Sequence, residues 1–234
     1  MNEMYSCTEH YTGNDYKKPR ELFKFIANII EMGLNDVTDF SILDVGCAKG
    51  EFLYYLSKRF SAYKPSLCGV DFSKALIECA KKFHGLDSTE LLLDNAETFA
   101  IRKKFDIITA TGIISFFDDY SPFLENLFRH LKPNGVVIIT NGFSTSNYDV
   151  YVKFRKFNQK AKTPESGWNQ HSINGINDYV SKADKKLITH KFELPFTLSK
   201  QDDLLRSWTI ETNEGQKFVN GLNQIWNLWS LEIK

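Results

Sequence analysis

The sequence predicts an α/β fold, in which a doubly wound, mostly parallel sheet of seven strands carries helices on both faces. Two observations support this prediction. Short apolar runs alternate along the chain with segments whose apolar residues recur every three or four positions, as on one face of a helix. The short runs are apolar at nearly every position, which is typical of strands buried on both faces of a parallel sheet.

The first half of the chain repeats this alternation of helix and strand. Pro19 opens the first helix, whose apolar residues form one stripe, and Gly33 ends it. Ser121 and Pro122 are predicted to be the N-cap and first helical residue of a later helix that runs to about residue 131. Strands are expected at 41–45, 66–70, 90–93, 105–109 and 136–140, with further helices at about 52–60 and 73–83.

The pattern changes in the second half of the chain. Residues 143–172 are rich in polar and aromatic residues, contain no clear strand and are long for a plain connection. A strand is expected over 185–194, a hairpin over 208–219 and a final strand over 227–233. These last strands complete the predicted sheet.

Composition favours one domain without a nucleic-acid or membrane partner. The 234 residues suffice for one α/β domain, and 29 basic side chains balance 29 acidic ones, so no overall basic field attracts nucleic acid. The four cysteines lack metal-ligand spacing, so no metal site is expected. Residues 1–16 lack the plan of a signal peptide, and no apolar run could cross a bilayer. We therefore expect a cytoplasmic monomer or homodimer.

The most informative motif is LDVGCAKGEF at 43–52, where an apolar strand meets a helix through a glycine turn. Such a turn exposes backbone and helix N–H groups at the strand end, where α/β folds hold ligands. A dinucleotide fingerprint would need glycines at 46, 48 and 51, but the chain has Ala48 and Glu51. The motif therefore favours a ligand with an amino-acid end, with Asp44 near its ammonium group.

A second carboxylate lies at the end of the next predicted strand. Asp71 follows Gly50 by 21 residues (71 − 50), the spacing at which α/β nucleotide sites place an acid on the ribose hydroxyls. The alternative is that Asp71 only opens the next helix, as a cap together with Ser73. Its distance from the glycine turn favours the ribose role.

With these residues and three later segments, the chain resembles the class I S-adenosylmethionine-dependent methyltransferases. The later segments are LLLDNAETF at 91–99, FDIITATGIISFFDD at 105–119 and LKPNG at 131–135. The resemblance covers about 38–142 strongly and implies S-adenosylmethionine as cofactor. It implies one domain over 1–234: an N-terminal arm and helix at 1–37, a cofactor-binding core at 38–142 and an acceptor-side part at 143–234.

The resemblance also implies positions around the cofactor. Asp94, Asn95 and Ala96 fall at the adenine, and Ala110 and Thr111 fall at the methionyl backbone. The full expected cofactor-binding set is Asp44, Gly46, Cys47, Ala48, Gly50, Asp71, Phe72, Asp94, Asn95, Ala96, Ala110 and Thr111.

Two segments are expected to form a cap over the acceptor: the N-terminal arm, and 143–172 with the later hairpin. In the arm, Tyr11 and Tyr16 either face the sulfonium side or pack the arm down, and related enzymes close such an arm over the cofactor. Arg20 lies in a basic cluster at a helix start, where the helix dipole disfavours positive charge. Either a bound anion stabilises this cluster, or the basic side chains are simply solvated. Trp168 and Trp208 are further candidates for acceptor contact.

A hydroxyl acceptor needs a base, and histidine is the natural one near neutral pH. His171 is the first candidate, because it lies in a segment expected to cover the site. Many members of the resembled family carry a histidine where this chain has Phe116, which leaves Asp118 or Asp119 nearby. The alternative for both acids is stabilisation of the following helix; magnesium ligation by them is poorly supported.

The resemblance, with the hairpin, implies methyl transfer to an O or N atom of a small polar acceptor. The hairpin is similar to one in small-molecule methyltransferases of bacterial surface-polysaccharide pathways, which suggests a sugar, nucleotide sugar or phosphorylated amino alcohol. Two alternatives stay open: a protein- or RNA-modifying methyltransferase, and a catalytically silent partner subunit that only binds the cofactor.

Overall fold

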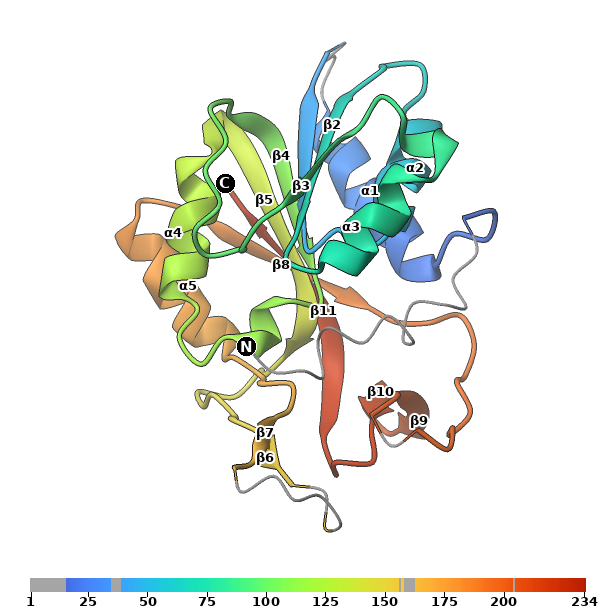
Figure 1. The fold of residues 1–234 in the computed structure, drawn as a ribbon. Helices are drawn as coiled ribbons and strands as arrows, with labels where there is room; N and C mark the ends of the chain where they lie inside the picture. The colour runs from blue at the N-terminus through green and yellow to red at the C-terminus, as the bar shows by residue number, and fades with distance from the viewer. Residues whose placement is uncertain (1–15, 35–38, 156, 158–162, 204) are drawn as a thin grey trace.

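The computed structural model describes residues 16–34, 39–155, 157, 163–203 and 205–234, and these form one mixed sheet flanked by helices (Figure 1). Its strands follow the order β3-β2-β1-β4-β5-β11-β10-β9, with β8 also paired to β11. The strands are β1 Ser41–Val45, β2 Ser66–Asp71, β3 Glu90–Leu93, β4 Phe105–Thr111, β5 Leu131–Phe143, β8 Leu187–Phe192, β9 Trp208–Thr212, β10 Gly215–Val219 and β11 Ile225–Ile233. The helices are α1 Glu21–Gly33, α2 Glu51–Arg59, α3 Lys74–Lys81, α4 Ser121–Arg129 and α5 Ile173–Lys182, with single turns η3 His84–Leu86 and η4 Ile114–Phe116.

The first five strands are parallel, as predicted. β1 lies between β2 and β4, and β4 pairs in parallel with β5. β11 runs antiparallel between β5 and β8. The strand order β3-β2-β1-β4-β5-β11-β8 therefore accounts for the seven predicted strands.

The sheet has nine strands because the C-terminal hairpin joins it. β11 begins at Ile225, whereas β8 pairs with it only from Leu228 onward. The first residues of β11 are therefore free to pair with β10, through Trp226 opposite Phe218. The hairpin that the sequence predicted, β9 with β10, is thus an extension of the sheet.

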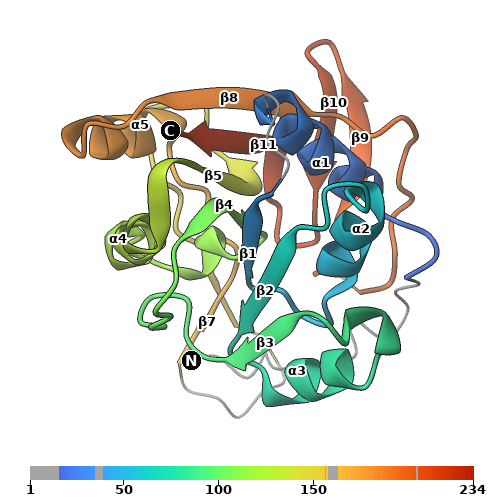
Figure 2. The same ribbon diagram turned by 90° about the horizontal axis from the view of Figure 1, so that it is seen from above.

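Helices cover both faces of the sheet, as predicted. Figure 2 shows α1, α2 and α3 on one face and α4 and α5 on the other. Alternate strand residues enter the two cores: Ile42 packs with the α1–α2 side, whereas Leu43 packs with the α4–α5 side. Strands with both faces covered explain the continuous apolar runs of the sequence.

Three local predictions differ from the structure. Ser121 is the first residue of α4 and not its N-cap; Tyr120 holds the cap position, and the Asp119 carboxylate accepts a hydrogen bond from the Ser121 N–H. The polar segment after β5 contains a two-residue ladder, β6 Lys153–Phe154 with β7 Glu165–Ser166.

The third difference is α5, which the sequence analysis did not assign. Ser172 caps it by accepting a hydrogen bond from the Gly175 N–H, and Ile176 and Val180 are buried against the sheet. The polar residues between these apolar positions hid the helix period.

Candidate functional site

The glycine turn after β1 has the backbone of a ligand cradle. Gly46 and Gly50 have φ angles of 80° and 77°, in the left-handed region that favours glycine. A side chain at Gly46 would also meet Ile113 at 2.5 Å. Ala48 is left-handed as well, with φ 49°, although it is not a glycine.

Asp71 ties this turn to the next helix. Its carboxylate accepts one hydrogen bond from the Ala48 N–H at 2.9 Å and another from the Ser73 N–H at 2.8 Å. Burial raises the pKa of Asp71, and these two hydrogen bonds partly offset that shift. The sequence alternative that Asp71 orders the start of α3 therefore has structural support, while its ribose role stays a prediction.

Asp44 is a buried carboxylate with no cation beside it. It is 3% exposed, and its Oδ1 accepts a hydrogen bond from the Thr109 hydroxyl at 2.8 Å. Burial raises its pKa to about 7, and the nearby Asp71 adds to the shift. Among the described residues Asp44 has no ion pair, so an ammonium group at this strand end would supply the missing charge.

The expected adenine segment lies beside the end of β2. The Asp94 N–H donates to the Asp71 carbonyl at 3.1 Å, which brings the two acids together. Asn95 accepts from Glu97 N–H, and the Ala96 carbonyl accepts from Asn126 of α4. This fixes the 94–96 turn at the carboxyl edge of the sheet.

The other expected cofactor residues contribute unequally. Cys47 is buried in the α1–α2 core and burial raises its pKa well above the usual range, so only its backbone is available to a ligand. Phe72 is partly exposed next to Asp71. Ala110 is buried, and the Thr111 hydroxyl is shielded from solvent without a partner among the described residues.

Tyr16 lies on the glycine turn. Its hydroxyl donates to the Lys49 carbonyl at 2.7 Å, and its ring stacks on Phe83 with centroids 3.7 Å apart. These contacts favour the interpretation in which Tyr16 itself packs against the glycine turn and Phe83. Tyr11 lies outside the described residues.

Arg20 has an anion of its own chain nearby. Its Nη2 lies 3.9 Å from an oxygen of Glu51, the buried first residue of α2, and its guanidinium stands over the Phe23 ring. Glu51 therefore explains part of the basic cluster, and a ligand contact by Arg20 stays a prediction.

His171 is buried, and only one of its two ring nitrogens, Nε2, has a hydrogen-bond partner among the described residues. Its Nε2 lies 3.0 Å from the Phe117 carbonyl and 3.3 Å from the Ile114 carbonyl, so this nitrogen carries the proton. Its Nδ1 has no partner among the described residues and keeps its lone pair. Burial lowers the pKa of His171, so the ring is neutral near pH 7.

Asp118 is less suited to act as a base. Hydrogen bonds from Asn169 and Lys153 lower its pKa, which keeps it ionised and partnered. Through these bonds it connects the turn after β4 with the segment that carries His171. Its catalytic role stays a prediction, with a positioning role as the better-supported one.

The two tryptophan candidates have other contacts. The Trp168 carbonyl accepts from Gln224 Nε2 at 2.7 Å, which joins the 143–172 segment to the residues before β11. Lys200 stands over the Trp208 ring at 5.2 Å, so that ring already has a cationic partner. Acceptor contact by either ring is untested.

Comparison with known proteins finds a family match over part of the chain. Residues 43–137 match the model of a family described as a methyltransferase domain. This part of the chain is therefore similar to a methyltransferase domain. The left-handed glycine turn and the unpaired Asp44 fit the amino-acid end of S-adenosylmethionine, the cofactor that these comparisons support.

The chain is similar to two curated enzymes over part of their length. It is 24% identical over 166 residues to malonyl-[acyl-carrier protein] O-methyltransferase of Priestia megaterium, covering 71% of this chain and 60% of that protein. It is 31% identical over 147 residues to ubiquinone biosynthesis O-methyltransferase of Pasteurella multocida, covering 57% of each. The chain thus spans little more than half of these two relatives.

The fold is shared with solved methyltransferases. An S-adenosylmethionine-dependent methyltransferase from Clostridium acetobutylicum superposes with a TM-score of 0.60 at 14% identity, covering 99% of this chain and 96% of the other. At this identity the likeness shows the fold alone.

Sequence reasoning missed several polar residues near the carboxyl edge of the methyltransferase sheet. Ser115 and Asn141 are buried, and each has a side-chain atom without a partner among the described residues. Tyr120 and Tyr151 flank the His171 ring edge-on, with centroids 4.9 and 6.2 Å away. An Asn-Gly pair directly after a buried strand was the available signal for Asn141.

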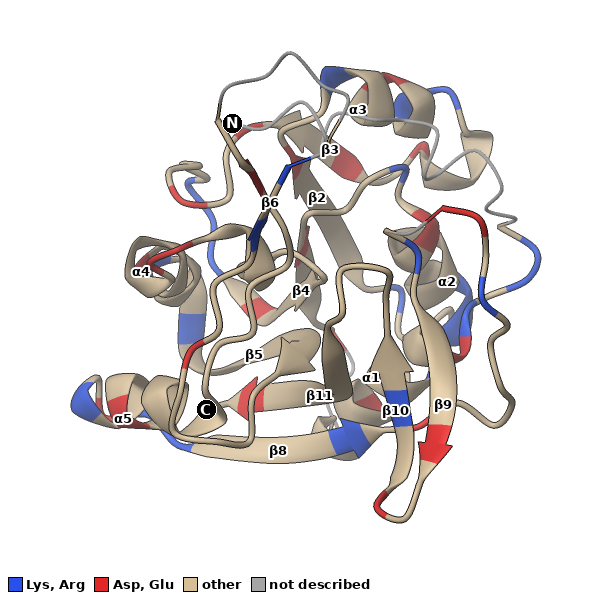
Figure 3. Ribbon diagram, turned by 90° about the horizontal axis from the view of Figure 1, so that it is seen from below, with Lys and Arg blue, Asp and Glu red and all other residues tan. Residues whose placement is uncertain are grey.

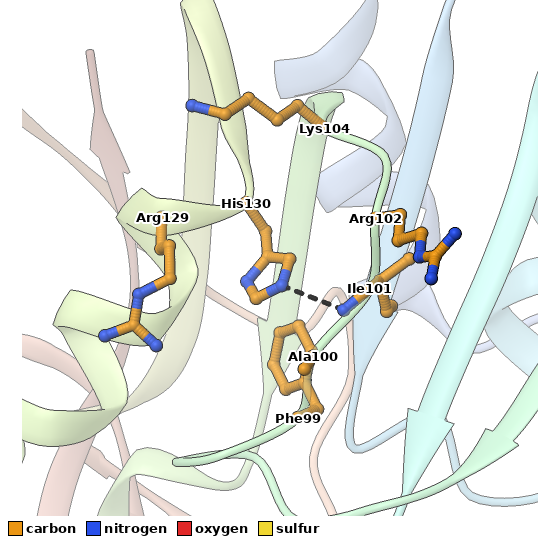
Figure 4. A pocket seen from close by; sticks show the side chains of 7 residues that line it. All are labelled: Phe99, Ala100, Ile101, Arg102, Lys104, Arg129 and His130. Atoms are coloured by element: carbon orange, nitrogen blue, oxygen red, sulfur yellow. Dashed lines mark hydrogen bonds between the residues drawn. The ribbon is translucent and has the colours of Figure 1, made fainter.

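A separate hollow of about 380 Å³ lies away from this site (Figure 4). It is lined by Phe99, Ala100, Ile101, Arg102, Lys104, Arg129 and His130, next to the start of β4. His130 accepts from the Ile101 N–H, and its Nδ1 lies 2.8 Å from the Asn126 carbonyl. Because the cofactor turn lies at the opposite end of the strands, this hollow has no part in the candidate site.

No described helix has the length and apolar content needed to span a membrane. Within the described ranges, no three histidine, cysteine or acidic side chains gather as a metal site would require.

Proposed function

We propose that the chain transfers a methyl group from S-adenosylmethionine to an oxygen or nitrogen atom of a small polar acceptor. The observation that carries this proposal is Asp44, a buried carboxylate without a cation, at the edge of a left-handed glycine turn. A buried unpaired charge is costly, and the ammonium end of the cofactor would compensate it. The Thr109 hydroxyl orients the Asp44 carboxylate for that contact.

When bound, S-adenosylmethionine would supply a methyl group on a positively charged sulfur. The acceptor lone pair would form a bond to the methyl carbon as the methyl–sulfur bond opposite it breaks, which leaves S-adenosylhomocysteine. Holding the acceptor in line can lower the barrier by about 7–11 kcal/mol. In the proposed mechanism the Nδ1 lone pair of His171 takes the proton of a hydroxyl acceptor. The Phe117 and Ile114 carbonyls hold the proton of Nε2, and so present Nδ1 in the form of a base.

An oxygen acceptor has the better support. The relatives named above are called O-methyltransferases, and a buried neutral histidine with a free lone pair suits removal of a hydroxyl proton. A sugar, nucleotide sugar or phosphorylated amino alcohol of a surface-polysaccharide pathway stays a proposal for the acceptor. The polar side chains of the 143–172 segment support a polar acceptor.

Titration calorimetry with S-adenosylmethionine and S-adenosylhomocysteine tests cofactor binding. We expect both to bind, and absence of binding by both would contradict the proposed function. Turnover is then measured as S-adenosylhomocysteine formation with a panel of hydroxyl and amine acceptors. Binding without turnover across a broad panel would support the silent-partner alternative.

The His171→Ala variant tests the base. We expect at least a hundredfold loss of turnover with a hydroxyl acceptor, because general bases contribute about 10²–10⁴-fold, while cofactor affinity stays within twofold. The matched control is His84→Ala, an exposed histidine of η3. Equal turnover of both variants would refute the role of His171.

A further inference from the structure

Several solvent-shielded polar side-chain atoms at one end of the sheet have no hydrogen-bond partner among the described residues. They lie on the ends of β4 and β5, in η4, on the 143–172 segment and on β11. The atoms are Thr111 Oγ1, Ser115 Oγ, Asn141 Nδ2, His171 Nδ1, Asn227 Oδ1 and Trp229 Nε1. An unsatisfied buried polar group destabilises the folded chain, so a concentration of them at the candidate site points to a polar ligand.

Two of these atoms lie on directly opposed residues. Asn141 on β5 pairs with Trp229 on antiparallel β11. Opposed residues of antiparallel strands project to the same face, with Cα atoms about 4.5–5.5 Å apart. The face is that of α4 and α5, because Phe143 and Leu231, each two residues further along, belong to that core.

The identity of the free Asn141 atom follows from its other hydrogen bond. The Gly142 N–H donates to Asn141 Oδ1 at 2.8 Å, which assigns the oxygen and leaves the NH₂ group free. The Trp229 indole nitrogen is a donor only. The pair therefore offers two N–H donors from opposed residues, which suits a ligand that accepts hydrogen bonds there.

The pair lies near the expected methyl position. Thr111, expected at the methionyl part of the cofactor, is level with Thr140 in the adjacent parallel strand. Asn141 is the next residue, about 3.3 Å further toward the carboxyl edge. A ligand atom held by Asn141 would thus lie just beyond the strand end that the cofactor is expected to cross.

The charge around the pair favours an uncharged ligand atom. Neither 135–143 nor 225–233 contains a lysine or arginine, and β11 shows no basic segment in Figure 3. On β8, Lys191 lies opposite Trp229, but its Nζ is already paired with the Glu193 carboxylate at 2.6 Å. Two neutral donors suit a carbonyl oxygen, whereas a buried carboxylate or phosphate would call for a cation.

We propose that Asn141 and Trp229 together bind an uncharged carbonyl-type oxygen of the acceptor, beside the atom that receives the methyl group. This inference rests on the proposed function and deepens it by defining the acceptor class. The acceptor then carries a methylatable atom close to an ester, amide, ketone or quinone oxygen. His171 on the neighbouring segment takes the proton where that atom is a hydroxyl.

The test uses ¹⁵N-labelled protein saturated with S-adenosylhomocysteine, with benzamide, benzoate and benzylamine as probes. Benzamide has a neutral carbonyl, benzoate a charged carboxylate and benzylamine no carbonyl oxygen. We expect benzamide to shift the Trp229 indole resonance and to bind at least tenfold tighter than benzylamine. That resonance is assigned from its absence in Trp229→Phe.

Variants separate recognition from folding. Trp229→Phe and Asn141→Leu should each weaken benzamide binding about five- to tenfold, the scale of one neutral hydrogen bond, and leave S-adenosylhomocysteine affinity within twofold. The matched control is Trp226→Phe, the same change on β11 at a residue that packs over Gly142 on the opposite face. This control should bind benzamide as the wild type does.

Each contrary outcome identifies what fails. If S-adenosylhomocysteine binds but benzamide leaves the wild-type Trp229 resonance unshifted, the acceptor inference is wrong and the proposed function stands. Tighter binding of benzoate than of benzamide would overturn the assignment of an uncharged oxygen. Failure to bind S-adenosylhomocysteine would remove the proposed function itself.

Discussion

At the scale of single residues, the site consists of buried polar groups whose partners are incomplete. The ionisable Asp44 carboxyl group accepts one hydrogen bond, from the neutral Thr109 hydroxyl. His171 Nε2 is hydrogen-bonded to the Phe117 carbonyl, whereas Nδ1 has no partner among the described residues. Both chemical states follow from burial, which raises the pKa of the acid and lowers that of the base. Burial therefore favours pairing of Asp44 with a cation, and it keeps His171 neutral and able to accept a proton.

The Asp44 titration predicts how cofactor affinity depends on pH. Its pKa is raised to about 7, so the carboxylate that pairs with the ammonium group forms only as the pH rises. We expect S-adenosylhomocysteine affinity to fall about tenfold per pH unit below pH 7. Calorimetry between pH 5 and 7.5 measures this slope.

The Asp44→Asn variant should bind S-adenosylhomocysteine more weakly than the wild type at pH 7.5. Its affinity should no longer change with pH between pH 5 and 7.5. Asp106→Asn is the matched control, because that acid pairs with Lys132 and Ser41 near the other end of the strands. A wild-type affinity that is flat over this range would show that Asp44 is not the ammonium partner.

At the scale of elements, the described part of the 143–172 segment is held mainly by side-chain hydrogen bonds, with only the short β6–β7 ladder as regular structure. The Asn169 amide accepts from the Val152 N–H at 3.1 Å and donates to the Phe117 carbonyl and to Asp118. It thereby joins the two arms of the 143–172 segment to the turn after β4. Such a segment keeps His171 in place without a long strand or helix.

We expect Asn169→Ala to loosen this segment. The substitution leaves the partly buried Val152 N–H without its partner, at a cost of about 1–3 kcal/mol, and removes one of two donors to the Phe117 carbonyl, the other being His171 Nε2. Limited proteolysis should cut faster within 143–172, and the KM for the acceptor should rise several-fold while cofactor affinity changes less than twofold. Asn174→Ala, an exposed residue of α5, is the control. Unchanged proteolysis and KM would show that the segment does not depend on Asn169.

At the scale of the whole molecule, β11 joins the parallel core to the C-terminal hairpin. Its second part lies between β5 and β8, and its first part pairs with the hairpin strand β10 (Figure 1). Gln224, just before β11, donates to the Trp168 carbonyl of the 143–172 segment. The C-terminal strand thus connects the hairpin and the 143–172 segment to the parallel core.

A substitution at Gly142 tests this coupling. A Cβ there would overlap the Trp226 ring, and overpacking of this kind costs about 1–3 kcal/mol. We expect Gly142→Ala to lower the melting temperature by several degrees, measured by calorimetry. Gly33→Ala is the control, because a Cβ at Gly33 meets nothing within 4 Å. Equal melting temperatures of the two variants would show that the junction between β5, β11 and the hairpin tolerates the added methyl group.

The sequence by itself determined the parallel core and the resemblance to methyltransferase domains, because apolar runs and the 43–52 turn are local patterns that predict strand, turn and helix. It also located Asp44 and Asp71, since strand ends are visible in the chain. Only the tertiary structure brought Asn141 opposite Trp229 and left one nitrogen of His171 free. Those facts depend on strand register and on hydrogen bonds between residues far apart in the chain, which no local pattern encodes.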